Sequence, residues 1–442
     1  MARTHDTRFS AKTKNDGSNR SASRGTLRSQ ASRFALHSTI GMSAVAGVSL
    51  IAPAQAWADC TVGGLTVQCS DTVTTNTTFP ANPPVDREYQ GASGSPIVVI
   101  VDSGKIVSGN GLAVSNSGTG GVTVTNNGTI SVDAGNTPTA GGTAALSVNA
   151  AGGTIDVSGG DIINNGNGNA LDAVQTAGAG TIVLDIAGNI SSASGEGITV
   201  RNVTTSTGVV VVTGGTVTAG SGDAIDVQTQ MLTGDAVITA YGDIKASNAG
   251  IVAAMIQGGA TGAVSVRAEG AIDARFGIDA ENFGSGGTDV TTIGPVTATT
   301  GNGIFAKAAG GNVSVSAGDV SSVGNTGIIA RQTNAAGLGG IFVIAGDVSG
   351  TTGIEATNSG AGPIEVVATG NVTGTLGEGV IATGNDAVSV AVAGTVTGAT
   401  TGLLVTGGTG GAGNIDVSAG GVAGGTGNAV TIQNNGAGSV SV

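Results

Sequence analysis

The charged residues best placed to act as catalytic groups are Asp273, Arg275, Asp279 and Glu281. Enzymes that cleave polysaccharides need clustered carboxylates or a basic residue that stabilises charge, usually beside aromatic platforms for the sugars. A set of surface ion pairs is the simpler interpretation, because Glu281 and Lys307 occupy matching positions of successive repeats. We therefore predict no catalytic residue and keep a polysaccharide-degrading enzyme as the alternative function.

A nucleophilic serine can be sought in GASGSP (91–96), which is similar to the nucleophile loop of chymotrypsin-like proteases. In that loop an Asp precedes the catalytic Ser, whereas here Ala92 precedes Ser93. Both histidines, His5 and His37, lie in a predicted leader. Ser93 would then have no imidazole base, so a serine protease is not expected.

The two cysteines, Cys60 and Cys69, lie in DCTVGGLTVQC (59–69), directly after the predicted leader. In an exported chain such a pair is expected to form a disulfide, which here would close a small loop around a Gly63-Gly64 turn. A metal-binding pair is the weaker alternative, because no histidine remains to complete a zinc site.

No metal site and no cofactor is predicted. Calcium-binding nonapeptides need tandem G-G-x-G-x-D units. Only scattered partial matches to this unit occur, such as GSGDAIDV (220–227), which we interpret as an ordinary Gly-Asp turn.

The candidate contact patch consists of Phe305, Lys307, Ile329 and Arg331. Phe305 and Ile329 each follow an inward isoleucine and should point outward, with Lys307 and Arg331 two residues further along the same face. Exposed apolar groups beside positive charge often mark a contact surface. The alternative is that a turn or a neighbouring domain covers these residues.

These residues are carried by a short repeat, seen in VSVSAGDVSSVGNTGI (313–328) and IFVIAGDVSGTTGI (341–354). Each copy has an alternating apolar strand, a Gly, a second strand and a Gly-Ile that opens a third. Copies open from Ile97 to Val440, with Val210 and Val237 among the openings, at a mean spacing of about 26 residues. Second strands centre on a column from Ile106 to Val422. The repeat predicts an all-β, right-handed parallel β-helix (β-solenoid) of about thirteen three-strand coils.

Residues 1–58 predict a signal peptide with an extended basic n-region. Eight of the 16 Lys and Arg residues lie in the first 33 positions, before an uncharged run (40–54) and small residues. Cleavage is expected after Ala58, with Ala56 as the alternative. The remaining chain has eight basic and 27 acidic residues, a formal charge of −19. Nucleic-acid binding is therefore disfavoured, because phosphate contacts require a basic face.

Beyond the leader, residues 59–95 predict an N-terminal cap with the cysteine pair, because they carry three of the eight prolines and no repeat. Residues 96–442 predict the parallel β-helix. The β-helix stops four residues into what reads as a fresh coil, so we expect it to be truncated at its C-terminus.

The chain combines a basic leader, an early cysteine pair and Gly/Val/Thr-rich coils with segments such as NNGTISVDAG (126–135) and AGNISSASGEGI (187–198). This combination resembles the passenger of an autotransporter (type V secretion). The resemblance implies export from a Gram-negative bacterium and display at the cell surface or outer membrane, or release from the cell. It implies a non-enzymatic stalk or adhesin whose partner is an unidentified cell-surface or extracellular matrix ligand. Contact with the outer membrane would be made only through a C-terminal translocator barrel, which this sequence does not contain. Either the sequence is a fragment or another export route is used.

Overall fold

The computed structural model describes residues 60–70, 73–74, 88–91, 94–138, 144–203, 205–408 and 413–442. These residues form strands joined by turns, and no helix occurs among them. Within the described ranges, accordingly, no helix has the length and apolarity to span a membrane. The predicted signal peptide lies outside the described residues.

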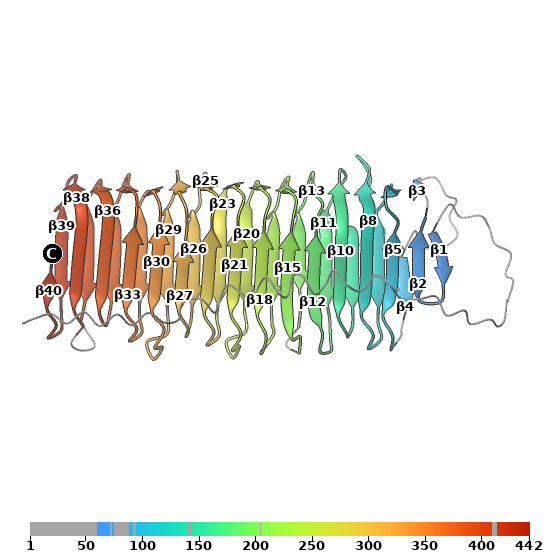
Figure 1. Cartoon of the computed structure of the whole chain (residues 1–442), viewed down its shortest axis with the longest axis horizontal. Coiled ribbons are helices and arrows are strands. Elements are labelled where there is room, and N and C mark those ends of the chain that lie inside the picture. The colour runs from blue at the N-terminus through green and yellow to red at the C-terminus, as the bar shows by residue number, and fades with distance from the viewer. Residues whose placement is uncertain are drawn as a thin grey trace, which may run out of the picture. The chain divides into compact units, whose positions relative to one another are not determined.

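The strands build a β-solenoid in which each coil contributes three strands (Figure 1). First and second strands join a 26-stranded sheet, and third strands form a 14-stranded sheet. The described strands of successive coils pair in parallel, as β23 (Phe276–Asn282) does with β26 (Ile304–Ala308). The predicted parallel β-helix is therefore confirmed, while its right-handed winding stays a prediction.

The first strands are β2 (Thr66–Cys69), β5 (Ile97–Val101), β12 (Thr181–Ile186), β15 (Gly208–Thr213), β18 (Ala236–Ala240), β21 (Val264–Ala268), β24 (Thr288–Thr292), β27 (Val313–Ser316), β30 (Ile341–Ala345), β33 (Ile364–Ala368) and β40 (Val440–Ser441). The second strands are β3 (Val73–Thr74), β6 (Ile106–Ser108), β13 (Ile190–Ser192), β16 (Val217–Ala219), β19 (Ile244–Ala246), β22 (Ile272–Ala274), β25 (Val296–Ala298), β28 (Val320–Ser322), β31 (Val348–Gly350) and β34 (Val372–Gly374). Long strands that combine both positions are β8 (Val122–Val132), β10 (Ile155–Asn164), β36 (Val388–Gly398) and β38 (Ile415–Gly424). The remaining third strands are β4 (Glu88–Gly91), β7 (Leu112–Asn116), β9 (Ala144–Ala150), β11 (Asn169–Gln175), β14 (Ile198–Arg201), β17 (Ile225–Thr229), β20 (Ala249–Met255), β29 (Ile328–Gln332), β32 (Ile354–Asn358), β35 (Val380–Gly384), β37 (Leu403–Gly407) and β39 (Val430–Asn434).

Side chains alternate between the interior and the outside along each strand, as β geometry requires. In β26, Ile304 and Ala306 are buried, whereas Phe305 and Lys307 are partly exposed. Parallel pairing without a shift places Ile304 directly above and below the isoleucines of neighbouring coils. The resulting aliphatic columns form one core cluster that extends from Val67 to Val417.

Some residues of the predicted repeat columns lie one position out of phase with the structure. Ile106 is 41% exposed, and the neighbouring Val107, which is fully buried, pairs with Ile130 instead. Val210 likewise faces outward beside the buried Val209. The predictions for Ile106 and Val210 are wrong because each lies next to another β-branched apolar residue, so alternation does not distinguish the two faces. The prediction for Val237, which lies between the buried Ala236 and Ile238, is wrong for the same reason.

A fully buried asparagine closes the third strand in several coils. The Nδ2 group of Asn282 donates to the carbonyl oxygens of Gly262 (2.8 Å) and Gly287 (3.1 Å). Its Oδ1 accepts from the backbone N–H of Gly284 (2.9 Å). Asn116, Asn358 and the partly exposed Asn434 make the corresponding sets of bonds. Each amide satisfies backbone groups where the chain turns inside the solenoid.

Glycines recur two residues before many first strands because neighbouring coils approach closely there. A methyl group at Gly262 would overlap the carbonyl oxygen of Gly234 in the preceding coil. The equivalent overlap occurs at Gly286 with Gly262 and at Gly339 with Gly311. Close approach of backbones therefore accounts for this glycine column.

The predicted disulfide joins Cys60 and Cys69 in the structure. It links β1 (Cys60–Gly63) to β2, and these two strands pair antiparallel. The segment predicted as a cap, 59–95, also supplies β2, β3 and β4, which pair in parallel with β5, β6 and β7. Coil-like pairing therefore begins before residue 96.

Candidate functional site

The four residues of the predicted contact patch lie on two neighbouring third strands, β26 and β29. Pairing sets Phe305 opposite Ile329 and Lys307 opposite Arg331. The structure therefore brings these residues into one group on the outer side of the 14-stranded sheet.

Both basic side chains of the contact patch have acidic partners in adjacent coils. Lys307 Nζ lies 3.6 Å from Glu281 Oε1 and 4.0 Å from the centre of the Phe283 ring. Arg331 Nη2 lies 2.6 Å from Glu355 Oε1, and Arg331 Nε donates to the same oxygen at 3.1 Å. The cross-coil pairing predicted for Glu281 and Lys307 is present.

Ile329 differs from the expectation of an exposed side chain. It alternates with the inward Ile328 and Ala330, but only 6% of it is exposed. Its column neighbours are Phe305 and Glu355, whose longer side chains lie one strand spacing away on either side. The accessible part of the contact patch therefore consists of Phe305, Lys307 and Arg331.

The charged residues between 273 and 281 are divided between two sheets. Asp273 belongs to β22 in the 26-stranded sheet, whereas Asp279 and Glu281 belong to β23 in the other. Arg275 Nε donates to Thr300 Oγ1 (3.0 Å), and its guanidinium lies 5.2 Å from the Phe276 ring centre. These residues do not converge on one site. Ser93 lies outside the described residues.

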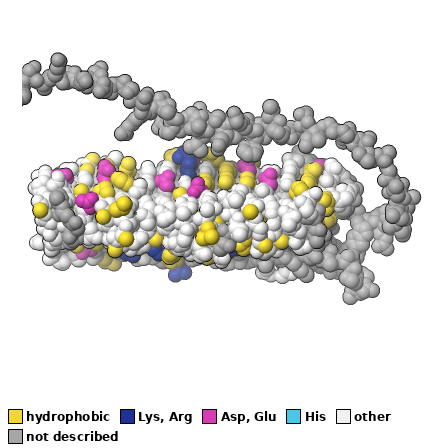
Figure 2. All heavy atoms as spheres, turned by 90° about the horizontal axis from the view of Figure 1, so that it is seen from below, with side chains coloured by type: hydrophobic (Ala, Val, Ile, Leu, Met, Phe, Trp, Pro, Cys, Tyr) yellow, Lys and Arg dark blue, Asp and Glu magenta, His cyan; other side chains and the backbone are white. Residues whose placement is uncertain are grey.

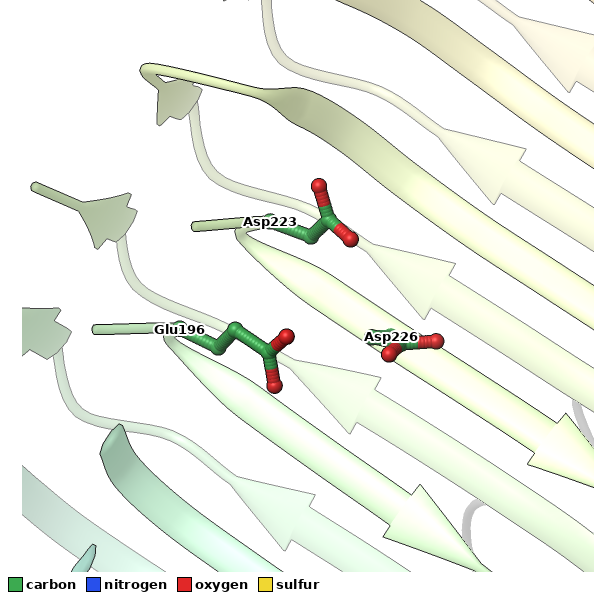
Figure 3. A group of neighbouring side chains, drawn as sticks. All are labelled: Glu196, Asp223 and Asp226. Carbon is green, nitrogen blue, oxygen red and sulfur yellow. The ribbon is translucent and has the colours of Figure 1, made fainter. Parts of the chain in front are cut away.

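A different carboxylate group, which the sequence analysis did not identify, lies where β14 and β17 begin (Figure 3). Glu196 and Asp223 stand at matching positions of successive coils, each two residues before its strand. Asp226 is the first outward residue of β17. One carboxylate oxygen from each of the three residues lies within 4.8 Å of the other two. We call Glu196, Asp223 and Asp226 the carboxylate cluster.

Two of the three carboxylates are held by hydrogen-bond donors from their own or a neighbouring coil. Glu196 Oε2 accepts from Thr199 Oγ1 and from Asn169 Nδ2. Asp223 Oδ1 accepts from Asn248 Nδ2 (2.6 Å) and from the backbone N–H of Ala249 (2.8 Å). These bonds fix the positions of both carboxylates on the outside of the sheet.

The third carboxylate, Asp226, is only 3% exposed. Its Oδ2 accepts from Arg201 Nη2 at 2.6 Å, whereas its Oδ1 is buried and has no hydrogen-bond partner. Burial raises the pKa of Asp226, and the charge of Asp223 adds to the rise against the opposing effect of Arg201. Burial also raises the pKa of Glu196, reinforced by the charges of Asp226 and Asp223.

Asp172 and Asp279 occupy the same outward column as Asp226, and burial disfavours their ionised forms as well. Burial raises the pKa of Asp172, against the hydrogen bonds from Asn169 and Thr199. Burial and the charge of Glu281 raise the pKa of Asp279 to about 6. The outer side of this sheet therefore holds several carboxylates whose ionised form is destabilised.

A shallow hollow lies on another face, along second strands β25, β28, β31 and β34. Its acidic residues serve the backbone: Asp319 Oδ1 accepts from the N–H of Asp347 (3.0 Å), and Asp347 Oδ1 accepts from that of Asn371 (2.6 Å). Figure 2 shows apolar side chains spread along the solenoid, with acidic and basic side chains next to some of them near its middle. We therefore assign no reactive site to this hollow.

No protein-family model, no curated protein and no solved structure matches this chain.

Proposed function

We propose that the chain is a secreted or surface-displayed, non-enzymatic β-helical stalk or adhesin, the passenger region of an autotransporter-like outer-membrane protein. The observation that carries the proposal is the continuous core from Val67 to Val417. Each coil contacts mainly its neighbours through backbone ladders and aliphatic columns, which gives an extended scaffold suited to holding a surface away from its anchor. The autotransporter resemblance of the sequence supports the export route.

The contact patch is the proposed attachment surface. Phe305 supplies partly exposed apolar area, and the side chain of Arg331 is 40% exposed although it is paired with Glu355. Aromatic and arginine side chains contribute strongly to protein–protein contacts because they combine large area with directional hydrogen bonding. The partner would be a cell-surface or extracellular matrix ligand.

Attachment of the purified full chain to immobilised matrix proteins and to cultured cells tests this proposal. We expect the double variant Phe305→Ala/Arg331→Ala to attach less while its circular dichroism is unchanged. A matched control is Phe342→Ala/Arg267→Ala, which removes the same residue types from the other sheet. Equal attachment by both double variants would exclude the contact patch. Failure of the wild-type chain to attach to any surface would contradict the adhesin function.

The second candidate is a polysaccharide-degrading enzyme, favoured by the carboxylate cluster. The raised pKa values of Glu196 and Asp226 would suit a general acid, with Asp223 as a neighbouring carboxylate. The test is the release of reducing ends from neutral and acidic polysaccharides by the wild-type chain and by Glu196→Gln/Asp226→Asn. Cleavage that is lost in this variant would support the enzyme, and absence of cleavage by the wild-type chain would exclude it for the substrates used.

A further inference from the structure

The carboxylate cluster brings together acidic side chains from two successive coils. Glu196 comes from the coil of β14, and Asp223 and Asp226 come from the coil of β17. Figure 3 shows the three side chains on the same side of the sheet, with the carboxylate of Glu196 between the two strand starts. Like charges at this spacing repel each other, so the arrangement requires a compensating positive charge or protonation.

Asp226 Oδ1 is buried and has no hydrogen-bond donor, so it indicates where the compensating positive charge would bind. In Figure 3 one carboxylate oxygen of Asp226 is directed toward Glu196 and the other away from it along β17. Oδ2 bonds to Arg201 and to Gln228, both of which lie further along their strands. Oδ1 is therefore the oxygen that faces Glu196, and it is buried without a donor.

The charges near the cluster are balanced only in part. Arg201 reaches Asp226 Oδ2, with 36% of its own side chain exposed. Three carboxylates and one guanidinium leave a formal charge of −2, which one divalent cation would neutralise. The donors to Glu196 and Asp223 are neutral amide, hydroxyl and backbone groups, which orient the carboxylates without neutralising them.

We propose that Glu196, Asp223 and Asp226 bind one divalent cation, with Ca²⁺ as the best-fitting ion, and that the ion fastens the coil of β14 to the coil of β17. An all-oxygen set excludes a preference for soft metals. Oxygens within 4.8 Å of one another fit around an ion whose ligands lie about 2.3–2.6 Å away. The remaining ligands would be water, because Glu196 and Asp223 are partly exposed. This site is independent of the proposed attachment function.

Calorimetric titration of the chelator-treated full chain with CaCl₂ tests the proposal, with MgCl₂ titrated separately. We expect one Ca²⁺ per chain with a Kd of about 10⁻⁴–10⁻³ M, the range of extracellular calcium modules, and weaker binding of Mg²⁺. In Glu196→Gln/Asp226→Asn, binding should weaken at least about tenfold, because two of the three charged ligands are lost. The control Asp289→Asn/Glu365→Gln makes the same charge change at exposed positions of β24 and β33 and should bind like the wild type.

Thermal melting provides a second readout that separates lost binding from misfolding. CaCl₂ at 10 mM should raise the Tm of the wild-type chain and of the control, but not that of Glu196→Gln/Asp226→Asn. If that variant does not fold, Asp223→Asn alone takes its place. No heat of binding up to 10 mM Ca²⁺, or equal binding by the cluster variant and the control, would overturn the proposal. Neither result bears on attachment, which depends on another part of the sheet.

Discussion

At the residue scale, the buried asparagines hold the turns of the solenoid in place. Asn282 is fully buried and serves one backbone N–H and two backbone carbonyl groups. A methyl side chain at this position could not replace any of these bonds. Each unsatisfied buried polar group costs about 1–3 kcal/mol of stability. The amide of Asn282 therefore stabilises the fold by more than its packing contacts alone would.

We therefore expect Asn282→Ala to destabilise the solenoid by about 3 kcal/mol, since several backbone groups lose their partner together. Hydrogen exchange at the Gly284 amide should accelerate, and the denaturation midpoint should fall. Ser265→Ala, at a partly exposed outward position of β21, is the control and should change stability by less than about 0.5 kcal/mol. Equal effects of the two substitutions would contradict the structural role of Asn282.

Asp279 makes stability depend on pH, because its folded pKa of about 6 lies above the ordinary value of 3.8 that applies to the unfolded chain. The folded state binds the proton more tightly, so stability falls as the pH rises from about 4 to 6 and stays lower above that range. Burial is the main cause. The charge of Glu281 adds to it, Lys307 opposes it and Asp223 contributes a smaller rise.

Asp279→Asn should consequently stabilise the chain at pH 8 by about 1–2 kcal/mol, less than the full shift would give because the side chain is partly exposed. The gain should shrink as the pH falls from 6 to 4 and vanish below about pH 3, where the wild-type carboxyl is protonated in both states. Melting curves at pH 4, 6 and 8 measure this difference. Asp289→Asn, at an exposed position of β24, removes the same charge and is the control. A pH-independent difference would argue against the desolvated carboxyl.

Residue-level prediction from the sequence succeeded for neighbours in equivalent coil positions and missed contacts made around the turns. The Glu281–Lys307 pair follows directly from repeat alignment. The carboxylate cluster combines a turn residue of one coil with a turn and a strand residue of the next, so alignment alone would have paired only Glu196 with Asp223. The usable signal was GSGDAIDV (220–227), whose two aspartates both belong to the cluster.

At the element scale, each coil is defined by the alternation of its strands and by how closely the next coil can approach. Backbones separated by about 4.8 Å leave no room for a Cβ where a turn tightens. At Gly262 the nearest atom to an added methyl group is the backbone oxygen of Gly234, which has no side-chain freedom to move aside. The glycine column is therefore part of the packing between coils.

Gly262→Ala should destabilise the solenoid by about 1–3 kcal/mol, the cost of forcing an extra methyl group into a packed region. Gly258→Ala is the matched control, because its added Cβ would meet only Phe283 O at 3.8 Å. That substitution should be neutral or slightly stabilising through the unfolded chain. Denaturation midpoints compare the two. If Gly262→Ala were as stable as Gly258→Ala, close backbone approach would not explain the column.

The element-level prediction of strands and columns worked where one apolar residue stands between polar ones. It failed in GVVVVT (208–213), where four consecutive valines leave both phases equally apolar. The same ambiguity affects Ile106 and Val107, and the structure resolves it through pairing with β8. Register in a solenoid is set by neighbouring coils, which a single window of sequence does not contain.

At the scale of the whole molecule, the described chain is one repeating core with a disulfide-linked antiparallel hairpin at its N-terminal end. Repeated coils of this kind gain stability mostly from nearest neighbours. Such a scaffold tolerates many different residues at its outward positions. The repeat therefore predicts the fold, but it does not predict which ligand the outward residues bind. Function must instead be tested at the contact patch, at the carboxylate cluster and in the cell.

The most direct test of the central claim is where the protein resides in its source organism. Antibodies raised against the purified chain should label intact, unpermeabilised cells or detect the protein in the culture medium. Protease added to intact cells should remove the surface label while a cytoplasmic marker stays intact. Detection only after the cells are lysed would contradict a secreted or surface-displayed stalk or adhesin.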